Sequence, residues 1–242
     1  MKIAKPITAQ ARDKHVHASP SVPKVRKLKR RPVGELPSRT NDPERTKADI
    51  LDVASREFAE KGLSGASVNE IAQVTRTSKR MIYYYFGSKE GLYRKVIEEN
   101  YRKLRALDAS MDLDKLAPLD ALVALVSVSF DFHHDHPEFV RLVMVENIHH
   151  ARHTAELPNL NQLNIGAIET LRKICNRGVE AGVIRSGIDP LALHITISAL
   201  CFHHVANRYT LSTIFGNDMT SKAALATRRQ IVIDTVVRYV AP

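Results

Sequence analysis

The sequence lacks the features that mark exported and membrane-embedded proteins. It has 2 cysteines and no tryptophan in 242 residues, and Cys175 and Cys201 form neither a metal-binding nor a redox spacing. A reducing compartment is the simplest explanation for this cysteine usage. No apolar run reaches the roughly 18 residues that a membrane helix needs, and the basic N-terminus lacks the apolar stretch of a secretory signal. We therefore expect a cytoplasmic protein with no membrane partner.

Signatures of catalysis are also missing. The sequence contains no glycine-rich phosphate loop, no nucleophile elbow and no ordered metal-binding motif. Neither cysteine has neighbours that indicate a reactive thiol. We therefore expect no enzymatic activity and no cofactor.

The whole chain has a formal net charge of +10, and the positive charge is concentrated in its N-terminal residues. Residues 1–43 contain 11 Lys and Arg against 3 Asp and Glu, residues 44–104 contain 12 against 9, and residues 105–242 contain 13 against 14. Such a basic N-terminal region favours a polyanion as its binding partner. Residues 105–242 are close to neutral, like an ordinary globular domain.

Residues 1–41 contain several prolines, a basic run from Lys24 to Arg31 and no sustained apolar period. This composition predicts a disordered basic arm. Two roles stay open for it. It is either a tail that aids solubility or an arm that lies along DNA phosphates or enters a minor groove.

Local signals predict four helices after this arm. Asp42 and Pro43 suit the start of a helix whose apolar residues recur at helical spacing up to Gly62. Ser67 to Glu70 form a capping box that starts a second helix. A third helix is expected from Ser78 to about residue 85, with a stop at Gly87, and a fourth from residue 89 to about 107.

The remainder of the chain also reads as helical. The expected helices span residues 121–132, 138–153, 159–182, 190–209 and 221–240. No segment shows the two-residue alternation of a half-buried strand bounded by turn signals. The sequence therefore predicts an all-α fold, in which the second and third helices and the turn at residues 75–77 form a helix-turn-helix.

These residues resemble the N-terminal domain of the TetR family of bacterial one-component transcriptional regulators. The matching stretches are Phe58–Gly62, Ala66–Ala72, Ser78 and Tyr83–Leu92; the later part matches only in the number, length and order of its helices. The resemblance implies a three-helix DNA-binding domain at residues 42–104 and a larger ligand-binding and dimerisation domain at 105–242. It also implies a sequence-specific regulator, most often a repressor, that binds a palindromic operator as a homodimer and is released by a small-molecule effector.

The family pattern assigns DNA contacts to particular side chains. Ser78, Lys79 and Arg80 would point into the major groove, with Arg80 suited to a guanine. Tyr83 and Tyr84 would add phosphate or thymine-methyl contacts, and Lys89 would clamp a phosphate at a helix start. The full set of expected DNA-binding residues is Arg45, Thr46, Ser67, Asn69, Arg76, Thr77, Ser78, Lys79, Arg80, Tyr83, Tyr84 and Lys89.

The turn of the helix-turn-helix departs from the family pattern. Family members usually place Ala-Gly where this chain has Thr75 and Arg76. A non-glycine residue with positive φ at this point would cost roughly 1 kcal/mol. Either the turn relaxes, or Arg76 is tolerated because it reaches a phosphate.

The last two helices are the expected dimer surface. Their apolar residues exceed what one internal face needs and are Leu193, Ile195, Ile197, Leu200, Phe202, Ile231, Val232, Val236 and Tyr239. The helix that begins at Lys89 joins the two domains and is the expected lever between effector and DNA. A non-specific architectural DNA binder is the main rival, but such a protein would not need a separate neutral helical domain.

Eleven histidines are many for this length, and most cluster at residues 133–136, 149–153 and 194–204. On a continuous helix, Glu146, His149 or His150, and His153 would share one face and could offer metal ligands. No tight metal signature is present, so no metal site is assigned. The alternative is a pocket lined by histidines and apolar groups for an organic acid or an aromatic metabolite.

Overall fold

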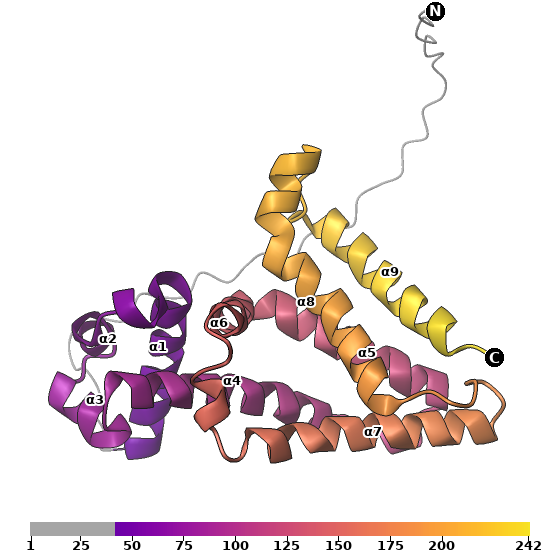
Figure 1. Cartoon of the computed structure of the whole chain (residues 1–242), viewed down its shortest axis with the longest axis horizontal. Helices are drawn as coiled ribbons and strands as arrows, with labels where there is room; N and C mark the ends of the chain where they lie inside the picture. The colour runs from indigo at the N-terminus through magenta and orange to yellow at the C-terminus, as the bar shows by residue number, and fades with distance from the viewer. Residues whose placement is uncertain (1–41) are drawn as a thin grey trace, which may run out of the picture. The chain divides into compact units, whose positions relative to one another are not determined.

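The computed structural model describes residues 42–242, and this part of the chain contains helices and no strand. The all-α prediction is confirmed, whereas the basic arm expected at residues 1–41 lies outside the described residues. The helices are α1 (Pro43–Gly65), α2 (Val68–Val74), α3 (Lys79–Phe86), α4 (Lys89–Ser110), α5 (Pro118–Asp135), α6 (Pro137–Ile148), α7 (Leu160–Glu180), α8 (Pro190–Phe215) and α9 (Lys222–Val240) (Figure 1). None of them is long and apolar enough to span a membrane.

Most of the helix starts are fixed by short side chains, as predicted for α1 and α2. Asp42 accepts hydrogen bonds from the first amides of α1, and Ser67, Ser78 and Ser88 do the same for α2, α3 and α4. Each cap satisfies an amide that would otherwise lack a partner. Gly62 has a φ of 67° and interrupts the helical geometry of α1 near its end, as expected for the residue predicted to stop this helix.

A first core holds α1 to α4 together. Phe58 of α1, Ile71 of α2, Ile82 of α3 and Tyr93 of α4 are fully or almost fully buried in it. Leu142 of α6 belongs to the same core. The helix-turn-helix therefore packs on α1 and α4, and α1 in turn packs on α6 of the C-terminal part.

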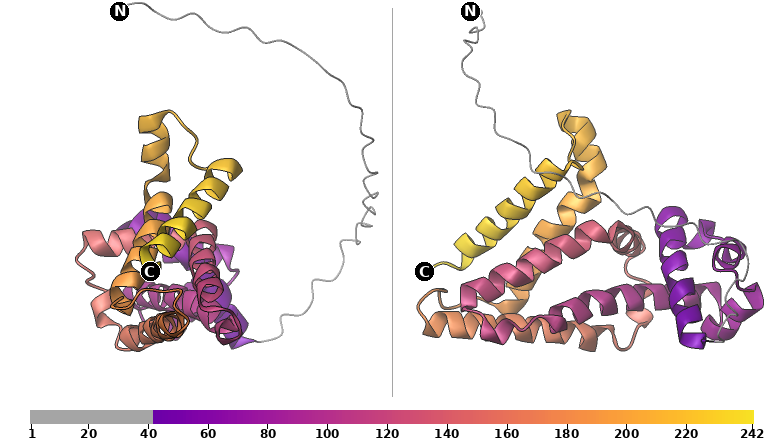
Figure 2. Two further views of the ribbon diagram at one scale, coloured as in Figure 1. Left: turned by 90° about the vertical axis from the view of Figure 1, so that its right-hand side faces the viewer. Right: turned by 180° about the vertical axis from the view of Figure 1, so that it is seen from behind.

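A second core lies among α5, α7, α8 and α9. It includes Leu122, Leu171, Leu193, Ile197 and Val236, all of which are buried. Figures 1 and 2 show α4 running from the helix-turn-helix to lie beside α7 under this second group of helices. The domain boundary expected at residues 104 and 105 thus falls inside α4, which belongs to the first core and continues to a small cluster where Leu104 packs with Phe132 of α5 and Phe139 of α6.

Two predicted helix ends are wrong. The helix expected to reach His153 ends at Ile148, because His150 and Ala151 have positive φ and the Glu146 carboxylate accepts from the amides of His153 and Thr154. The helix expected to end near residue 209 continues to Phe215. The first error matters, because Glu146 and His153 were predicted to lie on one helical face. His153 in fact lies beyond the end of α6.

Candidate DNA interface and ligand region

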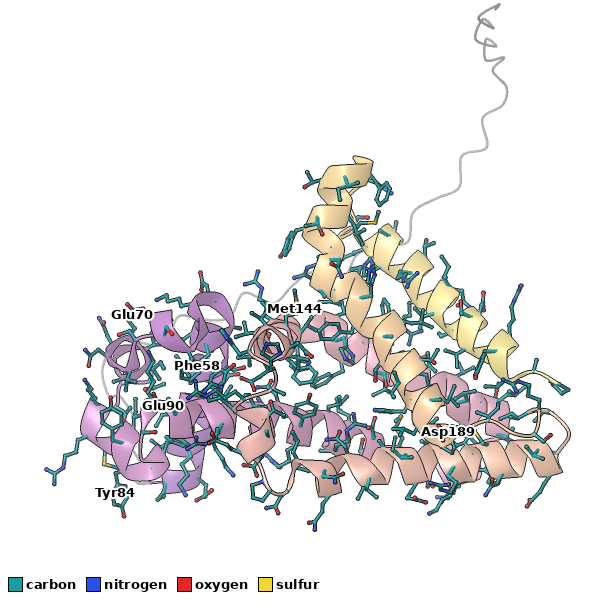
Figure 3. All side chains as sticks on the ribbon, in the orientation of Figure 1. Phe58, Glu70, Tyr84, Glu90, Met144 and Asp189 are labelled. Atoms are coloured by element: carbon teal, nitrogen blue, oxygen red, sulfur yellow. The ribbon has the colours of Figure 1, made fainter. Side chains whose placement is uncertain are left out.

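The exposed face of α3 carries the side chains predicted to read DNA. Ile82 is fully buried and anchors this short helix, while Lys79, Arg80 and Tyr83 are exposed. Tyr84 is 78% exposed, and Figure 3 shows it pointing away from the interior. The Lys79 ammonium lies 5.7 Å from the centre of the Tyr83 ring, which places a cation and an aromatic group together on this face.

The turn before α3 keeps the geometry that a glycine usually provides. Arg76 has a φ of 52°, its amide donates to the carbonyl of Gln73, and the Thr77 amide donates to the carbonyl of Ala72. This pair of bonds is a Schellman-type ending of α2. The first alternative, a relaxed turn, is therefore excluded. The Arg76 backbone adopts the left-handed conformation, and its side chain is exposed to solvent.

The other predicted contacts lie in the first turns of helices. Arg45 and Thr46 follow the Asp42 cap, and Asn69 is exposed two residues after the Ser67 cap. Helix N-termini favour anions because their free amides and dipoles are positive. Arg45, Thr46, Ser67, Asn69, Ser78, Lys79, Arg80 and Lys89 all lie in or at such a first turn.

Several of these hydroxyls and cations already have structural partners. The Ser78 Oγ accepts from the Met81 amide at 3.1 Å, and the Thr46 hydroxyl donates to the Asp42 carbonyl at 2.9 Å. The Lys89 ammonium donates to the Ser64 carbonyl at 3.1 Å, which ties the end of α1 to the start of α4. An ammonium has three donors, so this bond leaves Lys89 able to hold a phosphate.

The predicted capping box at Ser67 is only half formed. Ser67 Oγ accepts from the Glu70 amide at 3.4 Å, but the Ser67 amide donates to Glu57 Oε1 of α1 at 3.0 Å. Glu70 instead pairs with Lys61, which also contacts Glu57. This α1–α2 arrangement depends on a carboxylate ten residues away, which a local motif cannot reveal.

Two positioning features were missed in the sequence. The Lys47 ammonium lies 5.5 Å from the centre of the Tyr85 ring, which links α1 to α3. Gly91 lies so close to the end of α3 that a Cβ there would be 2.1 Å from the Phe86 carbonyl oxygen. Gly91 thus allows α3 and α4 to approach closely, a role that only the three-dimensional packing reveals.

A buried carboxylate connects α4 with the C-terminal helices. Glu146 of α6 accepts from the Tyr93 hydroxyl at 3.1 Å and from both the amide and the hydroxyl of Thr154, at 2.9 and 2.8 Å. Its Oε1 also lies 3.1 Å from the His153 Nδ1. Burial alone would raise the pKa of the Glu146 carboxyl, but these hydrogen bonds lower it below its ordinary value.

This network replaces the metal site considered in the sequence. Glu146 is committed to Tyr93, His153 and Thr154, and His149 and His150 are exposed. Within residues 42–242, no three His, Cys, Asp or Glu side chains are arranged to hold a metal ion. The helical face that would have grouped these residues does not exist, because α6 ends at Ile148.

A cavity of about 180 Å³ lies next to the Glu146 network, between α4 and α6. Its walls include Tyr101 of α4, Phe139 and Val143 of α6, and Glu146 itself. An engineered apolar cavity of roughly 150 Å³ is known to hold benzene, so this space is large enough for one small ring. The C-terminal part therefore has an internal space in direct contact with a residue that also touches Tyr93.

The predicted dimer residues divide into three groups. Leu193, Ile197, Val232 and Val236 are buried in the chain's own core, so assigning them to a dimer surface was wrong, and Leu200 and Phe202 are partly buried. Ile195, Ile231 and Tyr239 are 58%, 47% and 44% exposed. Helical periodicity in an apolar helix could not tell these faces apart, because both carry large aliphatic residues.

An exposed, capped and core-anchored α3 after a tight turn defines a helix-turn-helix DNA-binding protein. The family profile described as bacterial regulatory proteins of the tetR family matches residues 50–96, and that of the tetracyclin repressor-like C-terminal domain matches residues 118–236. The HTH-type transcriptional repressor NicS of Pseudomonas putida is 34% identical over 200 residues, covering 83% of this chain and 94% of NicS. The chain belongs to the TetR family, and it is a DNA-binding transcriptional regulator rather than an enzyme.

Other relatives agree with this assignment. The HTH-type transcriptional repressor KstR2 of Rhodococcus jostii is 28% identical over 147 residues, covering 59% of this chain and 70% of KstR2. A tetR-family regulatory protein from Rhodococcus RHA1 has the same fold, with a TM-score of 0.60, 20% identity, and coverage of 81% of this chain and 97% of that one. Regulators of this family bind operator DNA and small-molecule effectors, typically as dimers.

Proposed function

We propose that this protein is a repressor that binds an inverted-repeat operator as a homodimer and is released by a small molecule. The observation that carries the proposal is the geometry of α3, in which buried Ile82 fixes the helix while its cations and tyrosines remain exposed. Relatives named as repressors, NicS and KstR2 among them, support this direction of regulation. Because its target is the chromosome, its place of action is the cytoplasm.

In this proposal the contacts divide into base readers and phosphate contacts. Arg80 donates to a guanine edge in the major groove, beside Lys79 and Tyr83. The phosphate contacts fix the register of the protein on the duplex and come mainly from helix N-termini. They are made by Arg45, Thr46, Ser67, Asn69, Arg76, Thr77 and Lys89. Ser78 points into the major groove with Lys79 and Arg80, and Tyr84 meets a phosphate or a thymine methyl group.

The dimer is proposed to form through the outer faces of α8 and α9. Ile195, Ile231 and Tyr239 supply exposed apolar area on these helices. Pairing two copies would place two α3 helices on half-sites about one helical turn apart. Residues 105–242 thereby serve as the ligand-binding and dimerisation domain, and residues 42–104 as the DNA-binding domain.

Release by an effector is proposed to act through α4. Tyr93 of α4 packs edge to face on Phe58 of α1 at 5.1 Å, and its hydroxyl donates to Glu146. A ligand that moves α6 would pull on this bond and shift α4 relative to the helix-turn-helix. Such a ligand must bind the released conformation more tightly than the DNA-bound one.

A titration against DNA from immediately upstream of the protein's own gene tests the proposal, with random DNA of equal length as competitor at physiological salt. We expect saturable binding that survives competition and a footprint over an inverted repeat. Binding erased by the competitor would contradict specific operator binding at this site. An architectural role would then be favoured, because counterion release alone gives affinity without sequence preference.

A further inference from the structure

A cavity of about 630 Å³ lies between the end of α8 and the start of α9 (Figure 1) and shares no lining residue with the cavity beside Glu146. Sites for small molecules have volumes of roughly 300–1,000 Å³. The α9 wall is one face of that helix, because its lining residues recur at three- and four-residue spacing: Ser221, Ala224, Arg228 and Ile231. The opposite wall comes from α8 and the loop after it and includes His204, Leu211, Phe215 and Met219.

An unpaired cation lines this cavity. Arg228 is partly buried, and it has no hydrogen bond or ion pair within residues 42–242. The next residue, Arg229, is paired with both oxygens of Asp131, at 2.8 and 3.0 Å, so that carboxylate is already taken. The Arg228 guanidinium therefore keeps its donors free for an anion in the cavity.

A second copy of the chain has little negative charge to offer Arg228. Helix α8 contains no Asp or Glu, and α9 contains only Asp234, which accepts from Gln230 at 2.8 Å. Asp218, in the loop between the two helices, accepts from the amide and the hydroxyl of Thr220. If two copies pair through α8 and α9, the anion for Arg228 is thus expected to come from a ligand.

The start of α9 adds to this preference for negative charge. Ser221 Oγ accepts from the Ala224 amide at 3.3 Å, and both residues line the cavity. The amides of Lys222 and Ala223 lie in the first turn and so have no carbonyl of the helix to bind. Free amides and the helix dipole make this end positive and favour an anion.

A buried polar side chain without a complete set of partners lies in the inner wall. His204 is 4% exposed, and its Nε2 has no hydrogen-bond partner within residues 42–242. Burial, followed by the charge of Arg228, lowers the pKa of His204, so its ring is neutral at physiological pH. A buried polar atom of this kind needs an explanation, and a cavity that takes up a polar ligand supplies one.

The remaining walls are apolar. Leu211 and Met219 are partly buried, whereas Phe215 and Ile231 are 67% and 47% exposed. A small inorganic anion would leave these side chains in water. A hydrocarbon chain attached to the anion would cover them, and each Å² of apolar surface removed from water contributes about 25 cal/mol.

We infer that this cavity binds a small aliphatic carboxylic acid. The carboxylate lies on Arg228 and the start of α9, and the hydrocarbon chain lies against Leu211, Phe215 and Ile231. A guanidinium suits the head group because its planar fork matches the geometry of a carboxylate. The site is separate from the effector cavity beside Glu146 and goes beyond the proposed function.

Titration calorimetry of the full chain with three probes tests the ligand class. Octanoate carries both charge and chain, octanamide keeps the chain without the charge, and inorganic phosphate keeps a charge without the chain. We expect saturable binding of octanoate and little binding of the other two. No binding of octanoate, or equal binding of octanoate and either other probe, would overturn the inference.

Two variants place the ligand in this cavity. Arg228→Met removes a charge that has no partner to strand, so we expect a folded protein that binds octanoate roughly 10- to 100-fold more weakly, as for loss of hydrogen bonds to a charged group. Ala224→Leu fills part of the cavity and should weaken binding as well. Unchanged binding in either folded variant would overturn the inference.

Matched controls come from the same helix. Arg238→Met and Ala226→Leu make the same changes at exposed positions that do not line the cavity, and both should bind octanoate as the wild type does. Repeating the titration at protein concentrations where the chain is monomeric and where it is dimeric tests the partner copy as the occupant. Equal binding is expected, whereas binding confined to the monomer would assign the cavity to the partner and overturn the inference.

Discussion

The DNA-binding and C-terminal parts of the chain differ in where their functional polar side chains lie. Around α3 the charged and aromatic side chains lie on the surface, and caps at Ser67, Ser78 and Ser88 fix the helices that carry them. In the C-terminal part the informative polar groups, such as Glu146 and the Arg105–Asp108 pair, are buried among apolar residues. A DNA surface must meet a large partner, whereas a small ligand is best recognised where water is excluded.

Because α3 and α4 pack closely at Gly91, adding one methyl group there should strongly reduce both stability and DNA binding. In Gly91→Ala the new Cβ would meet the Phe86 carbonyl at 2.1 Å, and backbone cannot yield as a flexible side chain can. We expect a loss of about 3 kcal/mol or more in unfolding free energy, together with weaker operator binding. Chemical denaturation and a DNA titration measure the two effects.

Gly166→Ala is the matched control for this substitution. Gly166 lies within α7, and a Cβ there would meet nothing within 4 Å. Alanine should therefore stabilise the protein by roughly 0.5–1 kcal/mol through its higher helix propensity. Similar effects of the two substitutions would refute the packing role of Gly91.

A second substitution tests whether Glu146 links the two parts. Glu146→Gln keeps the shape but replaces one acceptor oxygen with a donor that faces the Tyr93, His153 or Thr154 donors. We expect a cost of roughly 1–3 kcal/mol and a weaker response of DNA binding to effector. Glu156→Gln, which removes only an exposed pair with Arg94, should cost less than about 1 kcal/mol.

Acid should destabilise the C-terminal part through the partly buried His194. The pKa of His194 is about 4 in the folded protein against an ordinary 6.5, because burial and the nearby Arg105 charge oppose protonation. As pH falls from 6.5 to 4, the unfolded chain binds this proton and the folded chain does not. Unfolding free energy should therefore fall by up to about 1.4 kcal/mol per pH unit for this group.

Replacing His194 by glutamine checks this pH dependence. Denaturation curves between pH 7 and 4 should show a shallower decline in His194→Gln than in the wild type. His149→Gln, at an exposed position after α6, should decline as the wild type does. Identical slopes in all three proteins would contradict the assignment to His194.

The smallest expected effect concerns the turn before α3. Arg76→Gly relieves a positive φ and should stabilise the fold by at most about 1 kcal/mol, while weakening DNA binding if Arg76 holds a phosphate. His150→Gly relieves a similar φ of 56° far from α3 along the chain, so it should stabilise without changing DNA affinity. A destabilised Arg76→Gly would show that the turn needs the arginine side chain.

Local signals explain why much of the DNA-binding part could be predicted. Ser78 and Ser88 are caps that act within three residues, and Gly62 is a helix stop that needs no distant partner. At Arg76 the sequence left two alternatives open, and the positive φ of 52° shows that the turn has not relaxed. The DNA roles of these residues remain predictions.

The C-terminal part depends on contacts that the sequence does not reveal. Helix α6 ends at Ile148 without a glycine, because Glu146 binds the amides of residues 153 and 154. Leu193 and Ile195 are both aliphatic residues of α8, yet the first is buried and the second exposed. Arg105 and Asp108 read as an ordinary solvated helix pair until the surrounding helices bury them.

Specific reading of DNA by Arg80 is the central claim, and one affinity ratio tests it most directly. The dissociation constants for the operator and for random DNA are measured with the wild type, Arg80→Ala, Lys89→Ala and Arg56→Ala. Arg56 serves as the matched control because it is an exposed arginine of α1 paired with Asp52.

Arg80→Ala is predicted to lose roughly 1–3 kcal/mol on the operator and little on random DNA, since a base contact carries sequence information. Lys89→Ala should weaken both DNAs alike, as expected for a phosphate contact, and Arg56→Ala should change neither. Equal losses on the two DNAs for Arg80→Ala, or no loss at all, would contradict the account.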